Sequence, residues 1–511
     1  MDAYHPLGKT FMIQKLSLYS FLLVTSLVSA SEPELNLDGT PYIPPRLAGD
    51  SLAIKPLKKA NDTDVNSIES MFTNGKIKGL IRYSTQYRDT AYHSLQSSLT
   101  PTANKIQQYS AIGGYLGYET ASYYNISLGA TFYTAQKFGH NPDERIGLGG
   151  LNEDGGRANA YAVLGESYIK YKTQNNDIRV GRREMPNYRF VSLSNIRFSP
   201  ITHQGATYER KVSKNLQLNF AYIDSQKDRN AESFINMIQA ARVQKSNIVG
   251  SYNPYNYDAG GNYIGSSKAM LMASAVYKKD TFSAEVWDYY ISDFVNTLYL
   301  YGDYNIVLSP TLTFTTAMQY AKQDNVGSRV AGDIDSWFYG LKFQVASKKG
   351  ITLFTSYNQV AYNENSYDGG TIFVRWGTPQ MFNSFQVQDS ETAGVKSYGA
   401  GVQFELGHMG IVPNTVIRFR YALYDMPDTL SDNFAAQDRT EATFDLRYSF
   451  TKNDGFGIFT EMQGLSVQFR VAYDDYKTNY DFQSYKNLHG YDFNEVTSDF
   501  IDTRLYIDYL F

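Results

Sequence analysis

Arginine is the residue whose placement in this sequence most suggests chemistry. Seven arginines occupy polar positions of segments in which apolar and polar residues alternate: Arg179, Arg183, Arg418, Arg420, Arg447, Arg470 and Arg504. A guanidinium group stays charged and can bind a carboxylate through two parallel hydrogen bonds. If these side chains face one water-filled space, they would attract and guide small anions.

The alternative is that each arginine pairs with an inward-facing acid, and the sequence leaves both interpretations open. Acids at comparable positions are Glu166, Glu405, Asp445 and Asp508.

Other chemistry finds little support in the sequence. The chain has no cysteine and six histidines, none at the spacing of metal ligands, so we expect no metal site and no cofactor. No serine lies in a nucleophile-elbow motif, and no glycine-rich stretch opens a helix as a phosphate-binding loop does. We therefore expect no catalytic residue and no enzyme activity.

The charge balance narrows the class of partner. Lys+Arg 47 against Asp+Glu 51 gives a formal net charge of -4, without a long basic run, so nucleic acid is not an expected partner. Only 19% of the residues are charged, yet a mean hydropathy of -0.40 is too polar for a bundle of apolar helices. The elements must therefore be amphipathic.

The N-terminus predicts export. The apolar run Leu16–Val28 follows a lysine and leads to a small-residue pattern that ends at Ala30. This is the pattern of a secretory signal peptide, which we predict over residues 1–30. Translation could begin at Met1 or at Met12.

Two further regions follow the predicted cleavage site. Residues 31–72 are polar and include Pro41, Pro44, Pro45 and Pro56, so we expect a mostly irregular periplasmic extension. Residues 73–511 are expected to form one domain.

Apolar and polar residues alternate throughout that domain. In Leu465–Tyr473 every odd position is apolar or aromatic, and Glu441–Phe450 and Ile417–Leu423 follow the same pattern. A period of two sends the two sets to opposite faces of a strand. Each run has about ten residues, the length that a tilted strand needs to cross a bilayer. No run after residue 30 is apolar for the ~18 residues of a transmembrane helix.

Three features favour a membrane barrel over a soluble β-sandwich. Aromatic residues lie near many strand ends, as in interfacial girdles. Tight turns such as Lys279-Asp280 alternate with long polar segments such as 226–267 and 359–395. The last strand, residues 498–511, should close a ring with the first, because only a closed sheet leaves no unpaired edge in hydrocarbon.

We therefore predict an all-β fold, a transmembrane antiparallel β-barrel of about 18 strands. Sixteen strands remain an alternative, because Trp287, Tyr289 and Tyr290 break the alternation within 281–306.

The region from Ile178 to Gly205 resembles a known family. Arg179-Val180-Gly181-Arg182, and then Arg197-Phe198-Ser199-Pro200 with Gly205 five residues later, are similar to the OprD-type outer membrane porin family. Its members show a strand ending in Arg-x-Gly-Arg and a folded loop ending in Arg-x-x-Pro-x-x-x-x-Gly. Segments 464–470 and 504–509 look similar too, and the likeness covers most of residues 73–511.

The resemblance implies an eighteen-stranded porin whose third extracellular loop, residues 185–204 here, bends inward and constricts the pore. It also implies a row of lumen arginines that guides small anionic or carboxylate-bearing nutrients. Arg197 and His203 would lie on the constricting loop, where we expect them to anchor it rather than to select solutes.

The expected function is passive diffusion of small hydrophilic solutes across the outer membrane of a Gram-negative bacterium, with a preference for carboxylate-bearing or anionic nutrients. Expected partners are outer membrane lipids, the solutes, the barrel-assembly machinery through the C-terminal Phe511, and further copies of the chain in a homo-oligomer. The alternative is an adhesin or structural barrel that acts through its extracellular loops.

Overall fold

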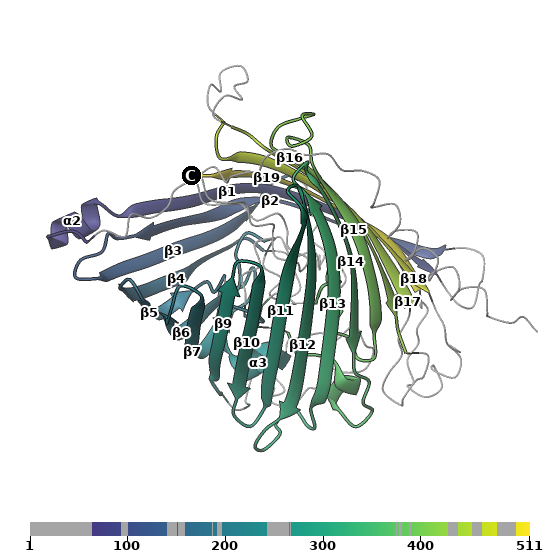
Figure 1. Cartoon of the computed structure of the whole chain (residues 1–511), viewed down its shortest axis with the longest axis horizontal. Coiled ribbons are helices and arrows are strands. Elements are labelled where there is room, and N and C mark those ends of the chain that lie inside the picture. The colour runs from purple at the N-terminus through teal and green to yellow at the C-terminus, as the bar shows by residue number, and fades with distance from the viewer. Residues whose placement is uncertain are drawn as a thin grey trace, which may run out of the picture.

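β-Strands dominate the structure, as the alternating sequence predicts (Figure 1). The structure is a computed structural model. It describes residues 64–93, 101–139, 151, 159–186, 188–191, 197–242, 265, 267–374, 376–377, 381–387, 390–427, 438–451, 462–477 and 497–511. The predicted signal peptide, residues 1–30, lies outside the described residues, as does the predicted extension up to residue 63.

The elements follow the period-two segments of the sequence. The strands are β1 Lys76–His93, β2 Pro101–Glu119, β3 Ile126–Lys137, β4 Tyr161–Lys172, β5 Asn176–Arg183, β6 Thr202–Lys211, β7 Leu216–Lys227, β8 Phe234–Asn236, β9 Met270–Lys279, β10 Phe282–Ile291, β11 Val295–Ser309, β12 Leu312–Asn325, β13 Asp335–Ser347, β14 Ile351–Val360, β15 Lys396–Glu405, β16 Thr415–Asp425, β17 Asp438–Ser449, β18 Leu465–Lys477 and β19 Thr497–Leu510. The helices are α2 Ile68–Thr73, α3 Met237–Arg242 and the 3-10 turn η3 Tyr367–Gly370.

The described strands form one antiparallel sheet that closes on itself. Neighbours in sequence pair with each other, and β1 pairs with β19 from Leu80 opposite Leu510 to His93 opposite Thr497. Of the 19 strands, the short β8 pairs only with the end of β7, which also pairs with β9. Eighteen strands therefore make the wall, which confirms the higher of the two predicted counts.

Segment 281–306, whose irregular sequence made sixteen strands an alternative, forms a regular pair of strands. β10 and β11 pair along their whole facing length, from Phe282 opposite Tyr304 to Ile291 opposite Val295. Its alternation is hidden in the sequence because both faces are apolar: Val286 points outward and is exposed, whereas Trp287 is buried inside the barrel.

The two faces of the wall are inverted relative to a soluble protein. On β16, Phe419 is 46% exposed, whereas its neighbours Arg418 and Arg420 point inward and are buried. Ile81, Leu300 and other large apolar side chains lie exposed on the outside in the same way. An apolar outer face around a polar interior is the arrangement of a transmembrane barrel. In the described part of the chain, no helix combines the length and apolar character needed to cross a bilayer.

The barrel has a short-turn end and a long-loop end. Turns such as 280–281 and 310–311 lie at the first, and segments such as 184–201 and 361–395 lie at the second. The helix α2 and the C-terminus lie at the short-turn end (Figure 1). There Val65 N–H donates to the carbonyl of Ser122 at 2.8 Å, which ties the segment before α2 to the turn between β2 and β3.

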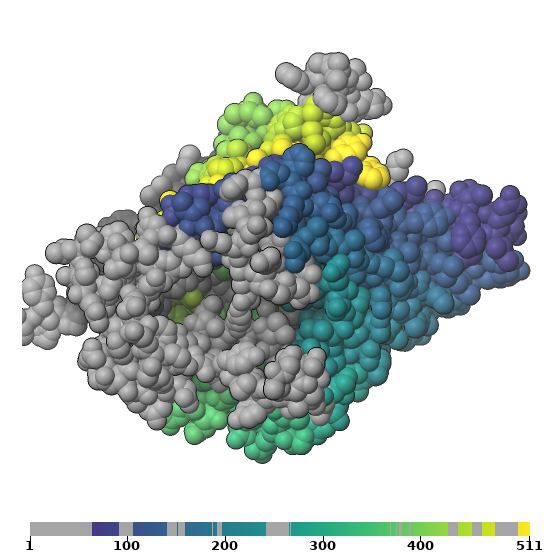
Figure 2. All heavy atoms as spheres, turned by 180° about the vertical axis from the view of Figure 1, so that it is seen from behind, coloured from purple at the N-terminus to yellow at the C-terminus, as the bar shows by residue number. Residues whose placement is uncertain are grey.

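The interior is packed unevenly. An apolar core fills the side of the lumen that faces β9 to β14, where Trp287, Tyr299 and Phe338 of the wall meet Phe190 and Trp376 of the loops. Buried arginines and acids gather instead on β16 to β19 and β1. Figure 2 shows the barrel from behind, with a hollow at one end through which green residues of the far wall are visible.

Candidate functional site

Strand register brings three of the predicted arginines into one row on the inner wall. Arg504 on β19 lies opposite Arg470 on β18. Arg470 lies opposite Asp445 on β17, and Asp445 lies opposite Arg418 on β16. Neighbouring strands are about 4.8 Å apart, so these inward side chains form a continuous row across the strands.

A second row lies two residues nearer the long-loop end. It runs from Arg88 on β1 to Asp502 on β19 and, beyond Ala472 and Thr443, to Arg420 on β16. We call the two rows together the arginine band. The band holds five arginines and two aspartates, a formal surplus of three positive charges (5 − 2 = 3).

Two of the four predicted arginines in the band have acidic partners. The Arg470 Nε atom lies 3.2 Å from Asp445 Oδ2, and both side chains are 2% exposed. The Arg504 Nε–H donates to Asp502 Oδ1 at 2.5 Å. Arg470 and Arg504 therefore follow the second interpretation, in which each arginine pairs with an inward-facing acid. The partner of Arg504 is Asp502, which was not among the four acids named from the sequence.

The other two predicted members of the band have neutral hydrogen-bond partners on the wall. The Arg418 Nε–H donates to Gln403 Oε1 at 3.2 Å, and the Arg420 Nε–H donates to Thr443 Oγ1 at 3.2 Å. The guanidinium group of Arg420 also lies 4.5 Å from the ring centre of Phe385.

The remaining predicted arginines lie apart from the band. Arg447 is on β17, opposite Gln468 and one row nearer the short-turn end. Arg179 and Arg183 are on β5, in another part of the wall. Arg179 pairs with Asp177 at 2.9 Å, and the Arg183 Nη1–H donates to Thr207 Oγ1 at 2.7 Å.

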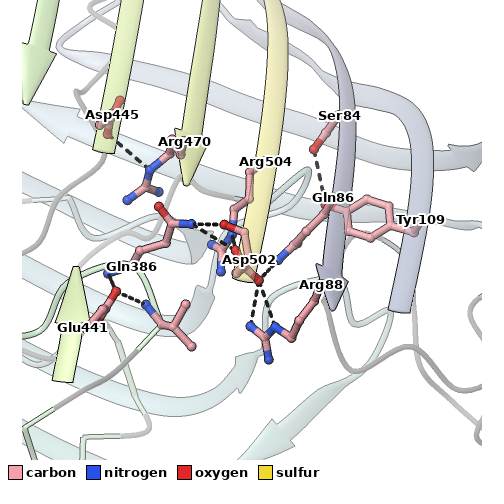
Figure 3. A network of polar contacts seen from close by, with 11 residues as sticks. Ser84, Gln86, Arg88, Tyr109, Gln386, Glu441, Asp445, Arg470, Asp502 and Arg504 are labelled. Carbon is pink, nitrogen blue, oxygen red and sulfur yellow. Dashed lines mark hydrogen bonds and ion pairs between the residues drawn. The ribbon is translucent and has the colours of Figure 1, made fainter. Parts of the chain in front are cut away.

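The sequence argument missed two inward arginines on β1. Arg88 pairs with Asp502 at 2.8 Å, and Arg82 pairs with Asp508 at 2.7 Å. Both occupy polar positions between the outward residues Ile81, Tyr83 and Tyr87, so the same period-two signal could have identified them. Figure 3 shows Arg88, Arg504 and two glutamines converging on the carboxylate of Asp502.

The segment between β5 and β6 contacts the inner wall at two places. Arg189 binds Glu285 of β10 through two hydrogen bonds of 2.8 and 3.0 Å, and the ring of Phe190 lies 5.1 Å from that of Tyr299 on β11. On another side of the lumen, Arg82 donates to the carbonyl of Arg197 at 2.9 Å. These contacts place residues 188–191 and 197 inside the barrel.

His203 does not lie on this loop, contrary to the prediction from the sequence. β6 begins at Thr202, inside the predicted loop range, because His203 already pairs with Arg183 of β5 and Thr202 with Lys227 of β7. His203 is fully buried, and its Nε2 atom lies 2.9 Å from the carbonyl of Trp376 in the segment between β14 and β15.

Glu184 is the first residue of the segment between β5 and β6, and its carboxyl group has a shifted pKa. Burial and the charge of Glu166 raise the pKa of the Glu184 carboxyl group to about 7. The hydroxyl of Tyr133 donates to Glu184 Oε1 at 2.6 Å, while Lys78 pairs with Glu166 at 2.7 Å. Near neutral pH, this carboxyl group exchanges between its neutral and charged forms.

A second inward segment, between β14 and β15, was expected only to be extended and polar. Its residues Ile372, Trp376 and Met381 are buried in the lumen core, and its Gln386 side chain donates to Asp502 of the arginine band at 3.0 Å. The apolar run Ile372–Val374 was the available sequence signal, because exposed loops rarely concentrate such residues.

No group of three or more His, Cys, Asp and Glu side chains within the described residues could hold a metal ion. The chemistry that the described arrangement can supply is electrostatic and hydrogen-bonding contact with an anion in transit.

Comparisons with known proteins agree with this architecture. The family model for "outer membrane porin, OprD family" matches residues 121–509. OccK9 (OpdG) of Pseudomonas aeruginosa is 17% identical with a TM-score of 0.62, over 85% of this chain and 98% of that one. OpdK of Pseudomonas aeruginosa, solved with vanillate, is 16% identical with a TM-score of 0.60, over 85% and 98%.

OccAB3 of Acinetobacter baumannii is 16% identical with a TM-score of 0.62, over 85% of this chain and 99% of that one. At these identities the three structures show a shared fold. Comparison with curated proteins finds no match.

Proposed function

The chain belongs to the OprD family of outer membrane porins, and from this premise we propose that the arginine band gives its pore a preference for small carboxylate-bearing solutes. The observation that carries the proposal is the surplus of positive charge in the band, five arginines against two aspartates. A cationic band on a low-dielectric wall raises the local concentration of anions.

The chemistry of the side chains supports a carboxylate rather than any anion. Arg420 uses its Nε–H for Thr443. Its terminal Nη2 atom has no hydrogen-bond partner but is buried, so a carboxylate would bind it only when the side chains packed around it, such as Phe385, move aside. A planar guanidinium edge matches the two oxygens of a carboxylate. Vanillate, which accompanies OpdK in its structure, is such a carboxylate.

Charge removal tests the proposal. We expect Arg418→Ala and Arg470→Ala each to lower the anion-to-cation permeability ratio, because one unit charge a few ångströms from a passing ion is worth on the order of 1 kcal/mol in water, about fivefold in local concentration. Reversal potentials in planar bilayers under a salt gradient measure the ratio.

Arg182→Ala is the matched control. Arg182 is on β5 next to the predicted lumen residues, but it donates to Gln204 at 2.9 Å and lies 4.3 Å from the ring centre of Phe234, outside the band. An unchanged ratio in Arg418→Ala and Arg470→Ala would contradict the selectivity role. Folded protein without any conductance would favour the adhesin alternative.

We further propose cleavage after Ala30, a periplasmic extension over residues 31–72, contact of the assembly machinery with Phe511, and a homo-oligomer. N-terminal sequencing of the mature protein tests the cleavage site, and protease access from the periplasmic side tests the extension. Membrane insertion of Phe511→Ala tests the contact with the assembly machinery, and the mass of the protein in detergent tests the homo-oligomer.

A further inference from the structure

The segment between β14 and β15 lies along the inner wall over several strands. Asn383 accepts a hydrogen bond from Ser356 of β14 at 2.6 Å and donates to Ser397 of β15 at 3.1 Å. The hydroxyl of Tyr424 on β16 donates to the carbonyl of Asn383 at 2.7 Å. The segment is therefore fixed to the wall before it reaches the arginine band.

Residues Phe385–Val387, which we call the loop tip, then lie over the band. Phe385 stacks on the guanidinium group of Arg420, with 4.5 Å to the ring centre. The side chain of Gln386 donates to Asp502 Oδ1 at 3.0 Å, so the tip touches two members of the same row. Figure 3 shows Gln386 between Glu441 on one side and Asp502 on the other.

One carboxylate of the wall holds the backbone of this tip. Glu441 Oε1 accepts the backbone N–H of Gln386 at 2.8 Å and that of Val387 at 3.0 Å. Glu441 is fully buried on β17, opposite Ala422 and one row beyond Arg420. Hydrogen bonds to an ionised acceptor are about twice as strong as neutral ones, and two successive N–H groups on one oxygen fix the course of the main chain.

We propose that Glu441 is a positioning residue that holds the loop tip over Arg420 and thereby sets how much of the arginine band a passing anion can reach. Glu441 touches no solute in this scheme; it acts through Phe385 and the backbone of residues 386 and 387. The inference rests on the proposed function of the band, because the reach of an anion matters only if the band attracts anions.

Two substitutions separate the reach of the carboxylate from its charge. Glu441→Gln keeps a carbonyl oxygen at the same reach and removes the charge. Glu441→Asp keeps the charge but withdraws the oxygens by one methylene, about 1.5 Å, too far to accept both N–H groups within the usual hydrogen-bond distance. A positioning role predicts that Glu441→Asp, and not Glu441→Gln, releases the tip.

A single thiol reports the position of the tip. The chain has no cysteine of its own, so Val387→Cys carries the only thiol, and Val387 contributes its backbone rather than its side chain to the contacts above. We expect a charged methanethiosulfonate reagent to label this thiol about tenfold faster with Glu441→Asp, and within about threefold of the parent rate with Glu441→Gln. Equal rates in all three backgrounds would overturn the proposal, as would equal acceleration by both substitutions.

Single-channel recording gives a second readout. Glu441→Asp should raise the conductance and reduce the discrimination between chloride and a bulky carboxylate such as benzoate, whereas Glu441→Gln should change only the anion preference. If Glu441→Asp does not fold, Val387→Pro is the substitute variant, because it removes one of the two donor N–H groups and leaves the wall unchanged. The positioning role requires that Val387→Pro raises the conductance. An unchanged conductance would overturn the proposal. A parent channel without anion preference would defeat the proposed function, while the labelling rates would still decide the positioning role.

Discussion

Glu184 links the charge of the lumen to pH through one side chain. Burial and the neighbouring Glu166 raise the pKa of its carboxyl group to about 7, so the group is neutral below about pH 7 and negative above it. As the pH falls from 8 to 6, the lumen loses one negative charge, and we expect the anion preference to rise. The effect should be at most on the order of 1 kcal/mol.

Reversal potentials recorded between pH 6 and 8 check this expectation. Glu184→Gln, which imitates the neutral form, should show the low-pH preference throughout and no dependence on pH in this range. A parent channel whose preference is flat across the same range would show that Glu184 does not titrate there.

The sequence predicted the face of each arginine better than its partner. The period of two is local, so the neighbours Phe419 and Arg420 reveal opposite faces without any other strand. The pairing of Arg470 with Asp445 instead depends on the register between β18 and β17, which is set by packing between segments that the sequence does not align. The contact of Arg504 with Asp502 lies within one strand, where spacing alone could have suggested it.

Arg189 anchors an inward loop to the wall at the scale of an element. Its guanidinium group binds Glu285 twice, at 2.8 and 3.0 Å, and lies 4.3 Å from the ring centre of Tyr301. Breaking a buried pair by removing one partner costs about 3–5 kcal/mol. We expect Arg189→Ala to free residues 188–191 from β10 and to increase both the single-channel conductance and its noise.

Arg329→Ala is the control for this experiment. Arg329 and Asp333 form an ion pair 2.5 Å apart, but their side chains are 57% and 59% exposed, and such surface pairs contribute about 0–1 kcal/mol. The single-channel conductance of Arg329→Ala should therefore match that of the parent. Equal conductance in Arg189→Ala and the parent would mean that the loop is held elsewhere.

The two inward segments differ in how far the sequence could predict them. Residues near Arg197 and Pro200 lie in a pattern shared with a known family, which implied that this loop folds inward. The segment between β14 and β15 carries no such pattern, and its contacts, such as Trp376 with Met237 at 3.0 Å, join residues far apart in the chain. Only the apolar run Ile372–Val374 indicated that it is buried.

The seam between β1 and β19 determines whether the whole barrel closes. Gly79 N–H donates to the carbonyl of Phe511 at 2.9 Å, and Phe511 N–H donates to the carbonyl of Gly79 at 3.0 Å. A Cβ atom at position 79 would lie 2.1 Å from the Phe511 ring, so Gly79→Ala must push the ring off the seam. Because the clashing atoms are the far end of a flexible side chain that is 46% exposed, we expect a loss of about 1 kcal/mol, at the low end for an overpacked site. It should be visible as earlier conversion to the unfolded band when unboiled samples are heated in SDS.

Gly302→Ala on β11 is the matched control. The nearest atom to a Cβ there is the Ser283 carbonyl oxygen at 3.6 Å, an ordinary contact. This variant should convert at the parent temperature. If Gly79→Ala does so too, the ring does not support the seam.

The closed barrel was predictable because alternation, segment length and the need to pair every edge all pointed to it. The strand count was ambiguous only at β10 and β11, where Trp287 and Tyr289 face the apolar lumen core and erase the contrast between the faces. A sequence reports which side of a strand is apolar, but not that the interior of a barrel can be apolar as well.

Because the lumen is filled unevenly, one side of the channel is apolar and the opposite side is positively charged. Aromatic and aliphatic side chains occupy the flank facing β9 to β14, and the guanidinium groups line the opposite flank at β16 to β19 and β1. A solute with a carboxylate at one end and an apolar group at the other would therefore cross the channel with its carboxylate toward the arginines and its apolar group toward the aromatic side chains. Of two isomers of equal size and charge, the one whose shape allows this orientation should pass through the channel faster.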